Sequence, residues 1–584
     1  MKKSYINKKK GVIFILTSLL LSNLALAKTS SNIPSNHIKI NWTTLPSNIN
    51  SNVKSAINNL TEELNNNKHE LPKAQLKRLI IKTIENAMAP YGYFSPKIVV
   101  SRHIYPHTIQ LDAQIDKRKP VKIKNITINI DNKANQWENL ARQYPQHTGD
   151  TLQTQLFTTY KNQLFQLASK LGYFNAHVTQ SVITINRKQH WANIDITFKP
   201  ESRFNFGKTN IKTNYLNPSF IRRYIQYTVG QPFNNTLIQD LQNNLQQSQY
   251  FSYLEVLPKP DRKTKQVKTT IYSHTSKRYH YLLGAGYGSD TGMRGTIGMQ
   301  VMPLNRKGHT FQIMTKLAQQ YSLIDGTYMI PGHNPVNTQY SLFIHLNQYN
   351  LPIGNSIASE IGGAINHIYN ISKTYALTQI TQLYQLNEGS TYTGRKKINQ
   401  SMMIGSLQFT LGPPISNLGT EHYFQWSIGA LAARKAFGSK IDFTQYRTSL
   451  NFIRIFKKKW RFVFSNTFAF TQVKNLYNLP ISLQLITGGN DSIRGYAYGA
   501  IGPGRYLSLG TITLQHRIMN NWFFGTFYDV GAASDGFFKN IKQSVGPTLT
   551  RTTPIGGLTF SLAKALSDPS KKGWSFTFTW GANL

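Results

Sequence analysis

The sequence of 584 residues contains no cysteine. This absence excludes a framework of disulfide bonds and any metal site built from thiolates. Acidic residues are also scarce, with 24 Asp and Glu against 66 Lys and Arg, which gives a net charge of +42. After the first 27 residues no run of 18 apolar residues occurs, so that part of the sequence predicts no membrane-spanning helix.

The positive charge is spread along the whole chain. Residues 1–27 carry +5, residues 28–277 carry +19 and residues 278–584 carry +18. Nucleic-acid binding requires basic residues that cluster on one face, and this even spread gives no such cluster. We therefore expect no nucleic-acid partner, whereas a basic surface would favour anionic lipid headgroups.

The first 27 residues have the composition of a signal peptide. Five lysines precede an apolar stretch from Gly11 to Leu24, and Ala25-Leu26-Ala27 fits the small-residue rule for cleavage. A membrane anchor is the alternative, although a spanning helix needs about 20 apolar residues and this stretch is shorter. We expect residues 1–27 to be removed on export.

Motifs that would indicate an enzyme are missing from the sequence. It has no His-Glu-x-x-His metal motif, no Gly-Lys-Ser/Thr phosphate loop and no Gly-x-Ser-x-Gly elbow. We therefore expect no enzyme activity, no catalytic residue, no bound metal and no cofactor.

A repeat of about 80 residues occupies the first half of the chain. Its mark is an aromatic pair after a helical pattern and before a strand pattern, in Gly92-Tyr93-Phe94, Gly172-Tyr173-Phe174 and Gln249-Tyr250-Phe251. A constant spacing on this scale predicts tandem small domains. We expect three α+β modules at residues 28–118, 119–201 and 202–277, in which a glycine ends the helix and the aromatic residues pack in the core. The third repeat has Gln249 in place of glycine, so its helix could end differently.

From about residue 278 the pattern changes to alternation of apolar and polar residues. Tyr340, Leu342, Ile344 and Leu346 alternate with more polar neighbours, and Trp460, Phe462 and Phe464 do the same. A soluble sandwich would also alternate, but 307 residues at roughly 19 per strand give about 16 strands, and tryptophans near strand ends suit the interfacial girdles of a barrel. We expect a 16-stranded transmembrane antiparallel β-barrel at residues 278–584.

One loop in the barrel region carries an arginine among glycines. The stretch Gly488 to Tyr498 contains Ile493-Arg494-Gly495-Tyr496, and glycines permit close approach of the backbone. Downstream, Asp529 and Gly531 lie in an expected strand. A guanidinium inside the lumen would find a bidentate partner in Asp529, which we expect to anchor the loop. An arginine hydrated in a wide lumen is the alternative.

The barrel should close where its first and last strands meet. Gly284, Gly286 and Gly288 occur in the first strand, and Phe576 and Phe578 in the last. Glycine adds no cross-strand packing and costs backbone entropy, so this seam should open more easily than other strand pairs. Simple curvature or bulging of the barrel is the other explanation for the glycines.

These residues carry a family resemblance. Residues Ile493 to Tyr496 resemble the loop-six motif of the outer-membrane assembly and secretion barrels, which include BamA and the two-partner secretion transporters. Asp529 and Gly531 lie in a stretch that resembles the family's Phe-x-Asp-x-Gly strand. Thr553 to Leu558 resembles the family's Pro-Ile-Gly-Pro-Leu strand, with Gly557 in place of the second proline. The repeats resemble POTRA domains, and three of them before such a barrel most resemble the TamA family, the outer-membrane subunits of the translocation and assembly module.

The resemblance implies a function and a location. It implies insertion or secretion of β-rich outer-membrane proteins, autotransporters in particular, without ATP or a cofactor. It also implies a barrel in the outer-membrane bilayer of a Gram-negative bacterium, periplasmic POTRA domains and an inner-membrane-anchored TamB-like partner bound through the first of them. The alternatives are a two-partner secretion translocator, which normally has two repeats and a plug helix, and a passive porin, which lacks such repeats. The last residue, Leu584, departs from the terminal aromatic that is common in outer-membrane barrels.

Overall fold

A computed structural model describes most of the chain: residues 37–66, 71–106, 108–372, 374–413, 422–457, 459–553, 556–568 and 573–581. The expected signal peptide lies outside these residues, as do Pro554, Ile555 and Leu584 of the motifs above. The chain divides into two compact units, one of residues 1–167 with 176–201 and one of residues 168–175 with 202–584. No helix in the described ranges is long and apolar enough to cross a membrane.

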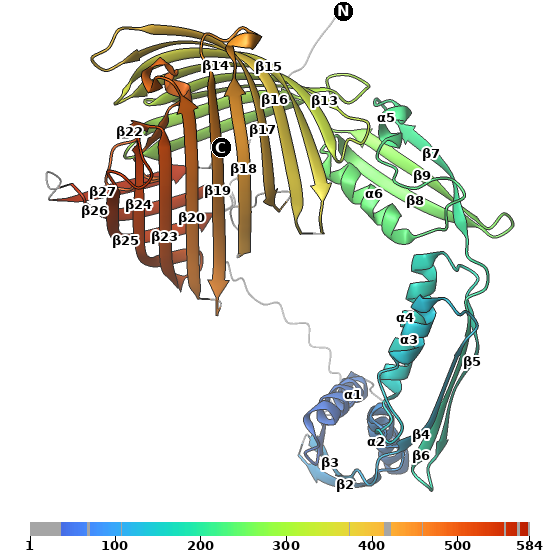
Figure 1. Cartoon of the computed structure of the whole chain (residues 1–584). Coiled ribbons are helices and arrows are strands. Elements are labelled where there is room, and N and C mark those ends of the chain that lie inside the picture. Colours follow the sequence, from blue (N-terminus) through green and yellow to red (C-terminus); the bar gives the residue numbers. More distant parts are fainter. Residues whose placement is uncertain are drawn as a thin grey trace, which may run out of the picture. The chain divides into compact units, whose positions relative to one another are not determined.

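The first module is a three-stranded sheet with two helices (Figure 1). Its elements are β1 (His37–Trp42), α1 (Ser47–Asn66), α2 (Lys73–Met88), η1 (Ala89–Tyr91), β2 (Lys97–Tyr105) and β3 (Thr108–Asp116). In the sheet, β3 lies between β1, to which it is parallel, and β2, to which it is antiparallel. The buried residues Val53, Ile57 and Leu60 recur at helical spacing on α1 and pack in one core with α2 and the sheet.

The second and third modules repeat this topology. The second contains β4 (Lys122–Ile130), α3 (Asn135–Arg142), α4 (Thr154–Leu171), β5 (His177–Asn186) and β6 (Trp191–Lys199). The third contains β7 (Asn205–Thr213), α5 (Pro218–Arg222), α6 (Asn235–Gln247), β8 (Phe251–Asp261) and β9 (Gln266–Thr275). Their sheet orders are β4-β6-β5 and β7-β9-β8, again with one parallel and one antiparallel pairing. The three expected α+β modules are thus confirmed.

The residue before each aromatic pair ends a helix in a left-handed conformation. Gly92, Gly172 and Gln249 have φ of 88°, 87° and 61°. The carbonyls of the two glycines also accept hydrogen bonds from the residue directly before the first strand of the next module, Val121 N at 2.8 Å and Phe204 N at 2.9 Å respectively. Gln249 thus takes the backbone conformation of the glycines, at the steric cost that any residue with a Cβ meets there.

The outer strand of the third sheet carries two prolines. Pro258 and Pro260 of β8 face Thr269 and Val267 of β9. In an antiparallel ladder, hydrogen-bonded and non-hydrogen-bonded residue pairs alternate, so residues two apart are both of the same kind. A proline has no N–H to donate to a neighbouring strand. Both prolines therefore fit the positions whose N–H would point away from β9, toward the open edge.

Sixteen antiparallel strands close into a barrel, which confirms the expected barrel and excludes a soluble sandwich (Figure 1). The first eight are β10 (Tyr279–Gly288), β11 (Gly292–Val301), β12 (Thr310–Ala318), β13 (Tyr321–Pro331), β14 (Thr338–Leu351), β15 (Gly354–Asn370), β16 (Ala376–Tyr392) and β17 (Ile398–Gly412). The last eight are β18 (His422–Ala433), β19 (Phe443–Phe456), β20 (Trp460–Val473), β23 (Tyr506–Met519), β24 (Trp522–Ser534), β25 (Lys542–Thr553), β26 (Gly556–Ala565) and β27 (Trp574–Gly581).

The alternation in the sequence separates the two faces of the barrel wall. On β14, Tyr340, Leu342 and Ile344 are 43–58% exposed on the outer face, whereas Phe343 is buried and His345 is half-buried on the lumenal face. An apolar outer face without a protein partner is what a lipid bilayer covers in a barrel of this kind.

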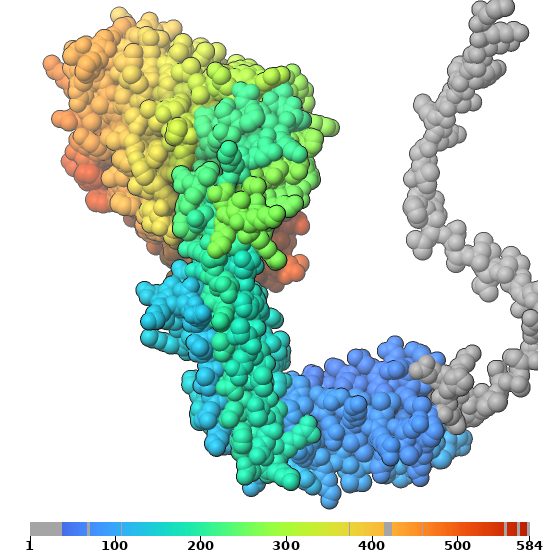
Figure 2. All heavy atoms as spheres, turned by 90° about the vertical axis from the view of Figure 1, so that its right-hand side faces the viewer, coloured from blue at the N-terminus to red at the C-terminus, as the bar shows by residue number. Residues whose placement is uncertain are grey.

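The third module packs against one end of the barrel, called the module end here; the opposite end is called the far end. Figure 2 shows the module, in green, continuous with the barrel wall. The Tyr250 hydroxyl donates to the Gly308 carbonyl at 2.5 Å, between β11 and β12. Arg223 Nη1 donates to the carbonyls of Pro331 at 3.2 Å and Gly332 at 2.9 Å, after β13. Burial raises the pKa of Tyr250 to about 12, so its hydroxyl stays protonated as a donor.

Candidate functional site: a lumenal loop and the barrel seam

Arg494 forms a buried ion pair with Asp529 of β24. Asp529 Oδ2 accepts from Arg494 Nε at 2.8 Å and from its backbone N at 3.1 Å, and Oδ1 accepts from Nη2 at 2.7 Å. The guanidinium also lies over the Phe527 ring, 3.4 Å from its centroid. Asp529 is fully buried and Arg494 is 9% exposed, so the fork geometry satisfies two charges that would be costly alone.

The other three residues of the motif fit the arginine against the wall. Ile493 is fully buried, and a Cβ on Gly531 would lie 3.1 Å from its Cδ1, so the glycine leaves room for it. Gly495 has φ of 86° and lies close to Ala563 of β26. The Tyr496 side chain is buried in a cluster with Ile493 and Leu507. The motif therefore fastens the loop to β23, β24 and β26.

The same loop also packs on other strands at the far end. Before the motif it contains η3 (Leu476–Asn478), η4 (Ile481–Leu483) and β21 (Leu485–Thr487), and β21 pairs with β22 (Ile501–Gly504) after the motif. The buried carboxylate of Glu388 on β16 accepts from the backbone N of Ser482 at 3.2 Å and from the Ser482 hydroxyl. Gln484 Nε2 donates to the Tyr392 hydroxyl at 2.5 Å. The loop thus spans from β16 to β24.

The tip of the loop reaches the barrel seam. The Asn490 backbone N donates to Asp290 Oδ2 at 2.7 Å, and its Nδ2 donates to Asp290 Oδ1 at 2.9 Å. The same Nδ2 lies 3.4 Å from the Phe578 carbonyl of β27. Asp290 lies in the turn directly after β10, so the Asn490 side chain contacts this turn and β27. We call Asn490, Asp290 and Phe578 the seam clasp.

The seam is paired over a very short length. Among the described residues, β10 and β27 form two residue pairs, Tyr287 with Trp580 and Gly288 with Thr579. By contrast, β10 forms ten pairs with β11, and β26 forms eight with β27. Gly286 lies close to the seam, since a Cβ on it would lie 2.7 Å from the Trp580 carbonyl. Most of β10 therefore presents backbone groups that β27 does not pair.

The structure separates the residues that the sequence singled out into two groups. Ile493, Arg494, Gly495 and Tyr496 meet Asp529 and Gly531. Gly288 pairs with Thr579 in the seam, and next to this pair the Phe578 carbonyl accepts from Ser289 N at 2.9 Å. Gly284, Gly286 and Phe576 lie on the two seam strands outside the residue pairs. In the described part of the chain no group of three His, Asp or Glu is placed to hold a metal ion.

Sequence reasoning missed Glu388, Asp290 and Asn490. Glu388 and Asp290 are among the few acidic residues of a basic barrel, which is a signal that could have marked them. Asn490 directly follows a glycine pair in the loop already singled out, but its partners lie 200 and 88 residues away. No local sequence pattern predicts the contacts of Asn490 with Asp290 and Phe578.

A closed barrel with an arginine-anchored loop in its lumen, preceded by repeated α+β modules, defines a class of multidomain membrane barrel. A family model described as the Omp85 superfamily domain matches residues 304–583. A model described as POTRA domain TamA domain 1 matches residues 40–117, and one described as surface antigen variable number repeat, a POTRA model, matches residues 121–201.

Three solved structures are similar to this chain. BamA from Haemophilus ducreyi, in a form lacking POTRA domains 1–3, is 16% identical over 79% of this chain and 99% of its own, with a TM-score of 0.65. CdiB from Acinetobacter baumannii is 12% identical, covers 92% and 99%, and has a TM-score of 0.49. CdiB from Escherichia coli is 10% identical, covers 79% and 90%, and has a TM-score of 0.47.

The chain is a member of the Omp85 superfamily and carries a TamA-type first POTRA domain. This membership assigns it to the insertion or secretion of outer-membrane proteins in general. The family is not a class of enzymes, and a 16-stranded barrel of this family fits the outer membrane of a Gram-negative bacterium.

Proposed function

We propose that this protein inserts or secretes β-barrel clients such as autotransporters through a weak seam between β10 and β27. In this proposal the POTRA domains lie in the periplasm, so the module end of the barrel is periplasmic and the far end is extracellular. The two-pair seam is the observation that carries the proposal.

Unpaired backbone groups destabilise a protein in lipid. Each N–H or C=O group left unpaired in a bilayer costs several kcal/mol. Most of β10 is not paired by the described part of β27, and it is a ready template for another strand. A client strand that pairs with β10 would satisfy these groups, so the same feature that weakens the closed barrel favours client entry.

The glycines of β10 support this reading. Gly284, Gly286 and Gly288 contribute no side chains to the seam, where Tyr287 packs on Phe578 with ring centroids 6.0 Å apart. The sheet edge of β10 would therefore accept a client strand of varied sequence, because the hydrogen bonds of the backbone do not depend on side chains.

The first two POTRA domains also offer sheet edges. β2 and β5 are the outer strands of their sheets, and Ile104 on β2 is 68% exposed. An extended segment could add to such an edge by backbone hydrogen bonds. We propose that clients, and an inner-membrane-anchored TamB-like partner at the first domain, bind in this way, without a cofactor.

Depletion of the protein tests the proposal. We expect the outer membrane of depleted cells to lose a few autotransporters while most barrel proteins remain at normal levels. A general collapse of outer-membrane proteins would indicate a broader, BamA-like role. Loss of one exported protein with no change in the membrane would indicate a two-partner secretion translocator, and either result would overturn the proposed specificity.

A further inference from the structure

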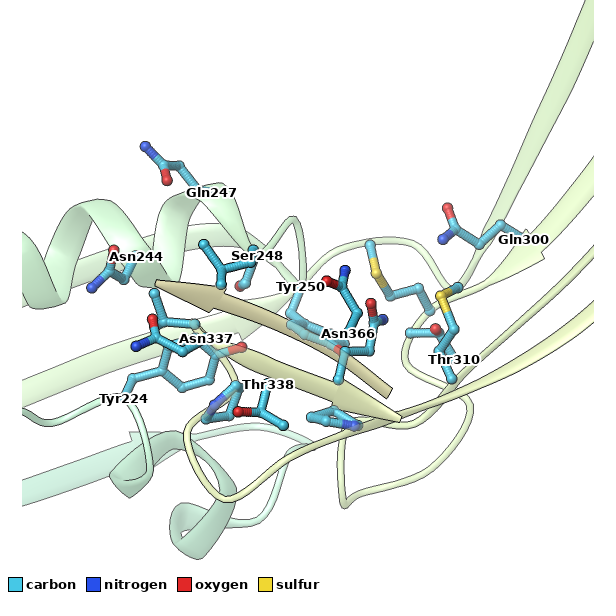
Figure 3. Close-up of a pocket in the computed structure, with 17 residues that line it drawn as sticks. Tyr224, Asn244, Gln247, Ser248, Tyr250, Gln300, Thr310, Asn337, Thr338 and Asn366 are labelled. Carbon is cyan, nitrogen blue, oxygen red and sulfur yellow. The ribbon is translucent and has the colours of Figure 1, made fainter. Parts of the chain in front are cut away.

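A cavity of about 300 Å³ lies between the third POTRA domain and the module end of the barrel lumen (Figure 3). The domain contributes Tyr224 and Tyr250 together with Asn244 and Gln247 of α6, and the barrel contributes residues from β11 to β15. Gln339 and Asn366 face each other across β14 and β15, on the lumenal side that they share with His345 and Glu360. Its volume is at the lower end of the usual range for ligand sites, about 300–1,000 Å³.

The lining of this cavity is polar but uncharged. Eleven of its 17 lining residues carry an amide or a hydroxyl group, and none of these described residues is Asp, Glu, Lys, Arg or His. The lining thus carries no charge in a protein whose net charge is +42. A phosphate or carboxylate ligand would find no ion-pair partner in it, and an acyl chain would leave the amides without partners.

Two of the amides lack partners that their burial calls for. The Oδ1 atoms of Asn337 and Asn366 are buried and accept no hydrogen bond from the described part of the chain. The backbone of Asn337 is satisfied, because its N donates to Asn334 and its carbonyl accepts from Ile368. An unpaired buried acceptor is destabilising, so a ligand that brings N–H donors would gain from reaching these atoms.

We infer that this cavity binds a short, extended and uncharged segment of a client polypeptide on its way from the POTRA domains to the seam. A peptide backbone alternates N–H donors and C=O acceptors, which is what six Asn and Gln side chains can match because each amide both donates and accepts. The apolar remainder, such as Met302 and Val336, suits the small or aromatic side chains of a β-strand. This inference rests on the proposed function and adds a client site to it.

Neighbouring identical residues on α6 give a matched test by photo-crosslinking in cells. Asn244 and Gln247 line the cavity, whereas the adjacent Asn243 and Gln246 are exposed and do not. A photoreactive phenylalanine analogue is placed at each of the four positions, and at Tyr287 in the seam, in full-length protein with an autotransporter client present. We expect client adducts at positions 244 and 247 to exceed those at 243 and 246 at least fivefold.

The seam position separates the two ideas. Client adducts at Tyr287 with none above control at 244 and 247 would overturn the cavity site and leave the proposed function standing. Client adducts at no position would overturn both. Adducts at 244 and 247 that contain a glycan or a lipid in place of polypeptide would also overturn the site.

The absence of charge gives a second, independent measurement. The purified full-length protein in detergent is titrated with a fluorescent ten-residue peptide that alternates aromatic residues with serine, threonine and asparagine, and with a second version in which two central residues are aspartate. We expect the charged peptide to bind at least tenfold more weakly, and Asn366→Leu to weaken the neutral peptide at least fivefold. The control Asn387→Leu, on the exposed outer face of β16, should change neither value. Equal binding of both peptides would contradict the inference.

Discussion

Asn490 binds Asp290 through both its backbone N, at 2.7 Å, and its side-chain Nδ2, at 2.9 Å. The loop that Arg494 fastens to β24 is therefore also fastened to the turn after β10 at the far end, and Nδ2 reaches the Phe578 carbonyl on β27. The seam has few strand pairs of its own, so this loop contributes part of what holds it closed.

Removal of the Asn490 side chain should release the seam clasp. A net hydrogen bond is worth about 0.5–1.5 kcal/mol, so Asn490→Ala should raise the population of the open seam by roughly tenfold. Planar-bilayer recordings would show this as more frequent openings. The control Asn387→Ala removes an exposed amide from the outer face of β16 and should leave the recordings unchanged. Equal opening frequencies in all three proteins would show that the clasp does not hold the seam.

Loss of the lumenal ion pair should be costly. Arg494→Ala leaves the fully buried Asp529 carboxylate without its partner, and breaking such a pair costs about 3–5 kcal/mol. We expect less heat-modifiable folded barrel on gels and reduced client assembly. Arg447→Ala is the matched control, because Arg447 shares the lumenal face of β19 with Gln445 but forms no hydrogen bond or ion pair with the residues described. If both variants behave like the wild type, Arg494 is no anchor.

A disulfide across the seam should block client insertion. Tyr287 and Trp580 face each other, and facing residues in antiparallel strands have Cα atoms about 4.5–5.5 Å apart, within the disulfide range of about 4.4–6.8 Å. The chain has no cysteine, so Tyr287→Cys with Trp580→Cys creates one possible bridge. We expect activity to disappear on oxidation and return with reductant. The pair Leu346→Cys and Ser359→Cys, in the long β14–β15 ladder, should have no effect when oxidised.

Gly92 and Gly149 have similar left-handed backbone conformations but different surroundings, so alanine substitutions at the two positions distinguish the cost of the conformation from the cost of a steric clash. Gly92 and Gly149 have φ of 88° and 94°, but a Cβ on Gly92 would lie 2.8 Å from the Leu152 carbonyl oxygen, whereas one on Gly149 meets nothing within 4 Å. Gly149→Ala should therefore cost only the left-handed penalty of about 1–2 kcal/mol. Gly92→Ala should cost more, seen as faster hydrogen exchange in residues 121–152. Equal exchange in the two variants would mean that the clash is relieved at no cost.

Acid should weaken the junction between the third POTRA domain and the barrel. Burial lowers the pKa of His309, and the charges of Lys307 and Arg223 lower it further, while the Tyr328 hydroxyl lies 2.6 Å from Nδ1. In the unfolded chain the pKa of His309 is about 6.5. At a pH between the lower folded-state pKa and about 6.5, the unfolded chain therefore binds more protons than the folded protein. The stabilisation from neutral His309 is complete above this pH range and is lost as the pH falls through it. We expect the melting temperature in detergent to drop more between pH 7.5 and 5.5 for the wild type than for His309→Asn. Equal drops would exclude His309 as the cause.

Local patterns predicted the elements of this fold well. The aromatic pairs at Tyr93, Tyr173 and Tyr250 marked three modules, and the two-residue period marked strands such as β14 and β20. These signals work because helix and strand periodicity depends on neighbours in the chain. The loop motif could be singled out for a similar reason, since its glycines and arginine are adjacent in sequence.

Contacts between distant segments could not be predicted in the same way. The stagger of the seam, which pairs Tyr287 with Trp580, depends on the register of every strand around the barrel. The burial of Glu388 under Ser482 depends on the path of a loop that starts about 90 residues later. A sequence pattern assigns a residue to a face of the wall, but the partner on that face follows from the closed geometry.

Pro258 and Pro260 give the POTRA domain next to the membrane a different character from the other two. With donors missing from its outer strand, that sheet resists templating by stray polypeptide, including copies of itself during biogenesis. A client that pairs with the edge strands of the first two domains would find no such edge on the third. Its further transfer would depend on recognition of side chains and not on backbone hydrogen bonds.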